Sequence, residues 1–275
     1  MKKLYISDLD GTLLNTSAEL SEFTKNAINE FTSRGGFFTI ATARTSETVR
    51  HIMKGVNLSA PMILMTGVFA LDPKTNKFIM SRHIDRAAVL GLIRISEKYK
   101  LSGFLYLDAE DHVETYYTRL CTEQSRSFKT EREQKYGKVF TKCTSFEDLD
   151  IDRTVYFSVC EERELLDEAA AELRRLDGLN INYFRDVYTD NLWYLDIGAS
   201  NSSKRSALDY LRTEYGFDHI TVFGDNYNDL PMFEAADTKI AVANAVPELK
   251  AEATEIICSN NEDGVAKYLL EQIEE

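Results

Sequence analysis

The chain has 275 residues, of which 44% are apolar and 28% are charged. This composition is typical of globular proteins, so it excludes a largely disordered or collagen-like chain, and the length suits one large or two ordinary domains. The 45 acidic and 32 basic residues leave a net charge of −13. Because such a chain repels phosphate backbones and acidic membranes, we expect neither a nucleic-acid partner nor a membrane partner.

The first third of the chain alternates short apolar runs with a helical pattern. Residues 4–6 read as a strand, and Ser21 is a candidate N-cap for a helix that two glycines end at Gly35-Gly36. The expected apolar face of this helix consists of Phe23, Ala27, Ile28 and Phe31. Residues 37–41 and 61–65 are apolar without alternation, which predicts parallel strands covered on both faces. A hairpin with strands at 68–71 and 78–80 is expected next.

The middle of the chain, residues 83–194, has a different pattern. Several of its predicted strands alternate apolar and polar residues, which indicates a sheet with one solvated face. After it, strands at 220–223, 240–242 and 256–257 again alternate with helices, and Gly264 to Ile273 closes as a helix. The expected fold is therefore a doubly wound parallel α/β core, residues 1–82 and 195–275, with an inserted α+β cap, residues 83–194.

Four polar motifs lie where the predicted core strands end or the next helix begins. They are Asp8-Leu9-Asp10-Gly11-Thr12-Leu13, Ala41-Thr42-Ala43-Arg44, Ser202-Ser203-Lys204 and Gly224-Asp225-Asn226-Tyr227-Asn228-Asp229. Ligands of open α/β sheets bind at the carboxyl edge of the strands, so these motifs are expected to converge. A lone Asp-x-Asp is usually only a turn or helix cap, but chance explains poorly why several such motifs follow apolar strands.

The residue types in these motifs indicate phosphoryl transfer. Clustered carboxylates repel one another by about 4 kcal/mol at ~4 Å and an effective dielectric of 20, and a divalent cation removes that cost. All-oxygen ligands suit Mg²⁺. Thr42 and Lys204 supply a hydroxyl and a cation for a phosphate, and Gly11 lets the backbone approach it closely. One of two carboxylates spaced as Asp8 and Asp10 can act as nucleophile while the other acts as acid and base.

With these motifs the chain resembles the haloacid dehalogenase-like (HAD) phosphatases of the Cof type, which carry an α/β cap after the third core strand. The resemblance covers the whole chain. It implies that Asp8 forms an aspartyl-phosphate and that Asp10 protonates the leaving alkoxide and then activates water. It also implies that Thr42 and Lys204 hold the phosphoryl oxygens. Further contacts with the phosphate are implied for Leu9, Gly11 and Ala43. The implied Mg²⁺ ligands are Asp8, the backbone carbonyl of Asp10, and Asp225, with Asn228 and Asp229 in support.

The chain departs from the family pattern at three positions. Ala43 and Arg205 stand where glycine is usual, and Thr66 stands where asparagine is usual before Gly67. Ala43 requires a turn without positive φ, or some strain, and Arg205 would either crowd the site or add charge to it. Two roles are compatible with Arg44, a position near the phosphate or a structural ion pair, and we favour the ion pair.

The resemblance implies a Mg²⁺-dependent phosphatase acting on small phosphorylated metabolites, with sugar phosphates as the expected class. Tyr116, Arg119 and Arg185 of the cap are candidate specificity contacts. The alternatives are a phosphomutase or phosphotransferase with the same nucleophile, and a non-enzymatic phosphoacceptor or sensor module. Four cysteines without a C-x-x-C pair, and no recognisable signal peptide or bilayer-length apolar stretch, predict a cytoplasmic protein, either a monomer or a small homo-oligomer.

Overall fold

The computed structural model describes residues 1–110, 112–186 and 191–274. Residues 111 and 187–190 of the expected cap, and residue 275 of the expected core, lie outside the described residues. The chain divides into two compact units, which are described separately. The core comprises residues 1–44, 49–79 and those from Ser203 onward, and the inserted unit comprises residues 45–48 and 80–202.

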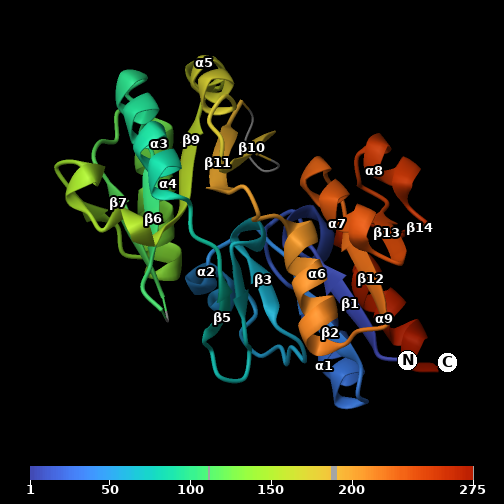
Figure 1. The fold of residues 1–275 in the computed structure, drawn as a ribbon. Coiled ribbons are helices and arrows are strands. Elements are labelled where there is room, and N and C mark those ends of the chain that lie inside the picture. Colours follow the sequence, from blue (N-terminus) through green and yellow to red (C-terminus); the bar gives the residue numbers. More distant parts are fainter. Residues whose placement is uncertain (111, 187–190, 275) are drawn as a thin grey trace. The chain divides into compact units, whose positions relative to one another are not determined.

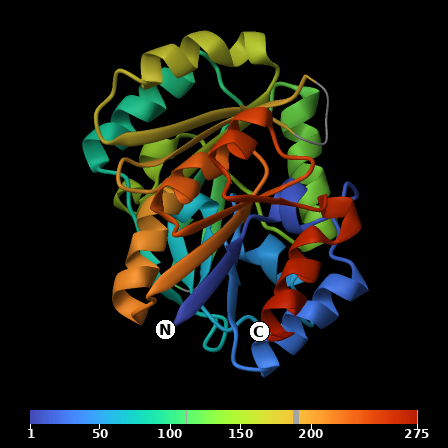
Figure 2. The ribbon, with the colours of Figure 1, turned by 90° about the vertical axis from the view of Figure 1, so that its right-hand side faces the viewer.

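The core is built on a parallel sheet of five strands in the order β14-β13-β12-β1-β2. Its strands are β1 (Lys3–Ser7), β2 (Phe37–Ile40), β12 (His219–Gly224), β13 (Thr238–Val242) and β14 (Glu255–Ile257). Figure 2 shows α6 on one side of these strands and α1 and α9 on the other. Because helices cover both faces of the sheet, β1 and β12 are buried at every position after their first residue, and the expected doubly wound core is confirmed.

The core helices follow the strands in chain order, and several begin at the predicted residue. They are α1 (Glu22–Ser33), α6 (Lys204–Tyr215), α7 (Leu230–Ala235), α8 (Pro247–Glu252) and α9 (Gly264–Glu274). Helix α2 (Ser46–Ile52) begins in residues 45–48 of the inserted unit and ends in the core. Ser21 caps α1 by accepting a hydrogen bond from the Thr24 amide at 2.9 Å. The apolar face of α1 was predicted wrongly at Phe23, which is 46% exposed, because Thr24 takes the buried position instead.

The third apolar run of the core does not extend the parallel sheet as a full strand. Strand β3 (Met62–Leu64) pairs antiparallel with β4 (Phe69–Leu71) in a three-stranded sheet that β5 (Phe78–Ser81) completes. A single parallel bridge between Ala41 and Ile63 links β3 to the end of β2. The hairpin prediction is therefore confirmed, whereas the prediction of β3 as an ordinary parallel core strand is wrong.

The inserted unit has its own sheet of six strands, in the order β10-β11-β9-β6-β7-β8. Its elements, several of which Figure 1 labels, are α3 (Arg86–Lys98), β6 (Phe104–Asp108), β7 (Val113–Tyr117), α4 (Glu123–Tyr136), β8 (Thr141–Lys142), β9 (Thr154–Glu161), α5 (Arg163–Leu173), β10 (Leu179–Arg185) and β11 (Trp193–Ala199). The strands pair antiparallel except for β7 with β8. This α+β character agrees with the predicted fold class.

Two details of the inserted unit differ from the sequence-based expectation. The boundary expected between residues 194 and 195 falls inside β11, which pairs with β9 and β10, so the chain returns to the core only at Ser203. The solvated sheet face is also not general, because all eight residues of β9 are buried. Helix α4 packs against β9, and Phe128 of α4 stacks on Phe104 with ring centroids 4.9 Å apart. Among the described residues, no helix combines the length and apolar character that a membrane crossing requires.

Candidate functional site

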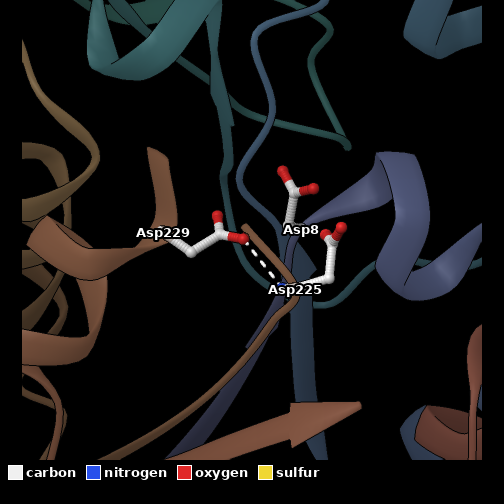
Figure 3. A group of neighbouring side chains, drawn as sticks. All are labelled: Asp8, Asp225 and Asp229. Carbon is white, nitrogen blue, oxygen red and sulfur yellow. Dashed lines mark hydrogen bonds between the residues drawn. The ribbon is translucent and has the colours of Figure 1, made fainter. Parts of the chain in front are cut away.

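Three carboxylates meet at the carboxyl edge of the core sheet. Asp8 directly follows β1, Asp225 directly follows β12, and Asp229 lies four residues further along the chain. All three are buried, and one carboxylate oxygen of each lies within 4.8 Å of the others. Figure 3 shows these three side chains together, with the Asp229 carboxylate accepting a hydrogen bond from the Asp225 amide at 3.0 Å. The parallel register of β1 and β12 brings the segments together, as predicted from the strand ends.

Lys204 supplies the cation inside this carboxylate group. It is the first residue of α6, whose N-terminus is capped by the Ser203 side chain through a hydrogen bond from the Ser206 amide. The Lys204 Nζ lies 2.5 Å from an oxygen of Asp8 and 2.6 Å from an oxygen of Asp229, and its side chain is fully buried. Burial alone would lower the pKa of Lys204, but Asp229 and Asp8 outweigh it and raise that pKa above its usual value. Lys204 therefore stays charged.

The two metal-ligand candidates at the strand ends have raised pKa values. Burial raises the pKa of Asp8 well above its usual value, against the opposing effect of Lys204. Burial and the neighbouring Asp229 raise the pKa of Asp225 to about 7, although the Thr12 hydroxyl opposes this by donating a hydrogen bond to Asp225 at 2.7 Å. Several buried carboxylates with raised pKa values in one place are typical of a site that binds a cation.

Two features of the site suit binding of Mg²⁺ by oxygen ligands. The side-chain oxygen Oδ1 of Asn228 is buried and has no hydrogen-bond partner among the described residues, so an oxygen ligand is available there. Gly11 has a φ of +81°, and a Cβ on it would lie 2.3 Å from an oxygen of Asp225, so only glycine leaves that carboxylate its space. An all-oxygen set of this kind fits Mg²⁺. Both oxygens of Asp229 are already engaged, by Lys204 and by backbone amides, which suits a supporting role.

Asp10 forms an ion pair with Arg44. The Arg44 guanidinium donates from Nε at 2.8 Å to one oxygen of Asp10 and from Nη2 at 2.6 Å to the other. This two-bond geometry fixes the plane of the carboxylate as well as its position. The ion pair favoured for Arg44 is present, but its partner is the expected acid–base residue. Sequence reasoning missed that link, and the only signal available for it was the position of Arg44 directly after the Thr42 motif.

Thr42 and its neighbours form a compact turn after β2. Thr42 is buried, its amide donates to the Ile63 carbonyl at 2.9 Å, and its hydroxyl oxygen accepts from the Arg44 amide at 3.2 Å. Ala43 is not among the described residues with positive φ, so the change from the usual glycine causes no strain of that kind. Arg205 does not crowd the carboxylates, because its exposed guanidinium pairs with Glu234 at 2.8 Å.

The remaining residues of the first motif shape the loop after β1. Leu9 is completely buried, and its carbonyl accepts the Leu14 amide at 2.9 Å. The carbonyl of Gly11 accepts a hydrogen bond from the Asn244 side chain at 2.7 Å, which ties this loop to the segment after β13.

The three candidate specificity residues all belong to the inserted unit. Tyr116 is partly buried and packs against the apolar cluster beneath α3 and α5, and burial raises the pKa of its hydroxyl. Arg119 is partly exposed, and Arg185 ends β10 as an exposed residue. Lys204, Asp225 and Asp229, which lie beside Asp8, belong to the core.

Comparisons with known proteins agree with this fold. The family described as haloacid dehalogenase-like hydrolase matches residues 5–269. The chain is 26% identical to the 5-amino-6-(5-phospho-D-ribitylamino)uracil phosphatase YitU of Bacillus subtilis (strain 168), covering 96% of this chain and 95% of that protein. It is 25% identical to the pyridoxal phosphate phosphatase YbhA of Escherichia coli (strain K12), covering 95% of each.

A solved structure shows the same likeness in three dimensions. The crystal structure of TM0651 from Thermotoga maritima superposes with a TM-score of 0.78 at 28% identity, covering 99% of this chain and 97% of that chain. The family resemblance expected from the motifs is therefore confirmed over the length of the chain. The chain belongs to the haloacid dehalogenase-like hydrolase family.

Proposed function

We propose that this protein is a Mg²⁺-dependent phosphatase that hydrolyses small phosphorylated metabolites through an aspartyl-phosphate on Asp8. The observation that carries the proposal is the contact of the buried Lys204 ammonium with Asp8 and Asp229 at the end of β1 and β12. It leaves a fixed cation beside a carboxylate nucleophile, which is the arrangement that a transferring phosphoryl group requires. The relatives named for pyridoxal phosphate and for a phosphoribityl compound support the substrate class, within which we propose sugar phosphates as the first to test.

The two halves of the reaction use the two aspartates of the first motif. In the first half, an Asp8 oxygen bonds to phosphorus, the bond from phosphorus to the ester oxygen breaks, and Asp10 gives its proton to the leaving alkoxide. In the second half, Asp10 takes a proton from water as the water oxygen attacks phosphorus, and the Asp8 carboxylate and inorganic phosphate are released. Lys204 and Thr42 hold the phosphoryl oxygens in both halves.

The metal site follows from the same residues. Asp8, the backbone carbonyl of Asp10, and Asp225 would hold Mg²⁺, with Asn228 as a further oxygen and Asp229 positioning Lys204 and the Asp225 amide. When bound, the ion supplies positive charge that offsets the repulsion among these carboxylates and the phosphate. A cytoplasmic location, and a monomeric or small oligomeric state, remain predictions from the sequence.

The proposal is tested by assaying p-nitrophenyl phosphate and a panel of sugar and cofactor phosphates with Mg²⁺ or with EDTA. We expect turnover only with Mg²⁺, loss of turnover in Asp8→Asn, and unchanged turnover in Asp209→Asn, a change at an exposed position of α6. Undiminished turnover by Asp8→Asn would refute the mechanism. A stable phosphoprotein without turnover would favour the sensor alternative, and transfer to a sugar hydroxyl instead of water would favour the phosphomutase.

A further inference from the structure

The turn after β3 has an unusual backbone for its position. Met65, Thr66 and Gly67 have φ values of +49°, +55° and +90°, so three consecutive residues are in the left-handed region. The two non-glycine residues are almost completely buried, with 1% and 8% of their surface exposed. A non-glycine residue in this region costs about 1–2 kcal/mol, and such a conformation persists only where the surrounding structure holds it in place.

The first two residues of the turn hold the Thr42 segment through their backbone. The Thr66 amide donates to the Thr42 carbonyl at 3.0 Å, and the Met65 amide donates to the Arg44 carbonyl at 3.2 Å. The left-handed conformation directs both amides toward the segment after β2. Thr42 is the proposed phosphate-binding residue, and Arg44 holds Asp10. The turn therefore sets the position of two groups that the proposed reaction uses.

The third residue of the turn contacts the start of α6. A Cβ on Gly67 would lie 2.1 Å from the Ser203 carbonyl oxygen and 2.4 Å from its carbonyl carbon. This carbonyl accepts the first hydrogen bond of the helix, from the Ala207 amide at 3.1 Å. Lys204 follows directly, so the backbone contact at Gly67 seats the helical turn that carries the buried ammonium.

We propose that the turn Met65–Gly67 is a positioning element that sets the separation between the phosphate-binding side chains of Thr42 and Lys204. It joins the two segments, which are far apart in sequence, through main-chain contacts on either side of a strained turn. The inference rests on the proposed function, because that function assigns phosphate binding to both residues. The turn itself is not proposed to contact the substrate.

The test compares two glycine-to-alanine variants with the same backbone penalty. In Gly67→Ala either the turn or Ser203 must shift by about 1 Å, since Cβ contacts under 3.0 Å are essentially never seen in real structures. Gly35→Ala has a similar φ of +91° but meets nothing within 4 Å. Both are expected to lose similar stability from the left-handed position, about 1 kcal/mol. Only Gly67→Ala should move Lys204.

The readout is the affinity for inorganic phosphate in the presence of Mg²⁺, measured by calorimetry and as product inhibition. We expect Gly67→Ala to weaken phosphate binding at least ~10-fold and to lower kcat by up to ~10²-fold, because misplacement by 1 Å has effects of that size. Gly35→Ala should bind phosphate as the wild type does. Equal phosphate affinity in the two variants, with equal losses of melting temperature, would overturn the inference and leave the turn a purely structural role.

Two further measurements keep the result interpretable. If Gly67→Ala does not fold, the same change is made in a Ser203→Gly background, because glycine is tolerated at an N-cap and keeps the backbone atoms that the new Cβ meets. The double variant should bind phosphate more weakly than Ser203→Gly alone, and equal affinities would overturn the inference. Failure of the proposed function has a different signature, since the wild type itself would then neither bind phosphate nor turn over.

Discussion

Replacing Arg44 by alanine is expected to slow the proposed reaction at the step that needs a proton. Arg44 makes two hydrogen bonds to Asp10, of 2.8 and 2.6 Å, and these orient the carboxyl group that would protonate the leaving alkoxide. Alanine removes these two bonds, so the Asp10 carboxyl group is held less firmly in line with the ester oxygen. The chemistry at Asp8 and Lys204 remains intact in this variant.

The size of the effect follows from the geometry of the pair. Hydrogen bonds to charged groups contribute about 1.5–3 kcal/mol each when buried. Because the Arg44 and Asp10 side chains are 18% and 27% exposed, solvent screening reduces the net contribution of the two bonds together to about 1.5 kcal/mol. A loss of about 1.4 kcal/mol corresponds to a ~10-fold fall in kcat. The ceiling is the full effect of a general acid, about 10²–10⁴-fold, which Asp10→Ala should approach.

The assay compares substrates that differ in their need for a proton. Alkyl phosphates have poor leaving groups and should show the full ~10-fold loss in Arg44→Ala, whereas p-nitrophenyl phosphate should show much less. Arg44→Lys keeps the charge but not the two-bond geometry, so it should fall between alanine and the wild type. Arg34→Ala removes an exposed pair with Glu30 and serves as the control. An equal loss for both kinds of substrate would refute the positioning argument.

Three more predictions concern the metal, the buried lysine and the inserted unit. Asn228→Ala should raise the Mg²⁺ concentration for half-maximal activity about 10-fold, measured by titration, because it removes the unpartnered oxygen; an unchanged value would exclude Asn228 from the metal site. Lys204→Met should lower the free energy of unfolding without Mg²⁺ by about 3–5 kcal/mol in urea, since Asp8 and Asp229 are left buried without their cation; a loss near zero would contradict that pairing. Burial raises the pKa of Asp196 to about 6, against the opposing hydrogen bond from Ser158. The folded protein therefore holds this proton more tightly than the unfolded chain, and the stability it contributes should be lost as pH rises from about 4 to 6. Melting temperatures of Asp196→Asn should lack that fall, and a wild-type slope retained in the variant would refute the assignment.

Much of the core could be predicted because local patterns and local chemistry coincide there. Apolar runs without alternation at β1, β2 and β12 require cover on both faces, and the polar motif directly after each strand places its side chain at the carboxyl edge. Ser21 and Ser203 mark the starts of α1 and α6 through hydrogen bonds within three residues. Such contacts depend only on neighbours in the chain.

Other features depended on partners far along the chain. A short apolar run such as 61–65 looks the same whether it joins a parallel sheet or folds back on its neighbour, and tertiary contacts chose the hairpin with β4. The alternating strand at 193–199 belongs to the inserted sheet because β9 and β10 lie beside it. Phe23 is exposed for the same reason, because burial on α1 depends on which surfaces pack against that helix.

The sequence by itself therefore determined the class of chemistry, since carboxylates and a hydroxyl directly after parallel strands meet at one edge of the sheet, and a lysine at the start of a helix supplies the cation. The tertiary structure alone decided which of these groups contact one another. It placed Lys204 between Asp8 and Asp229, Arg44 on Asp10, and Gly67 against Ser203. The reason is physical: a residue type and its spacing specify what a side chain can bind, whereas its distance to a partner many residues away depends on how the whole core packs.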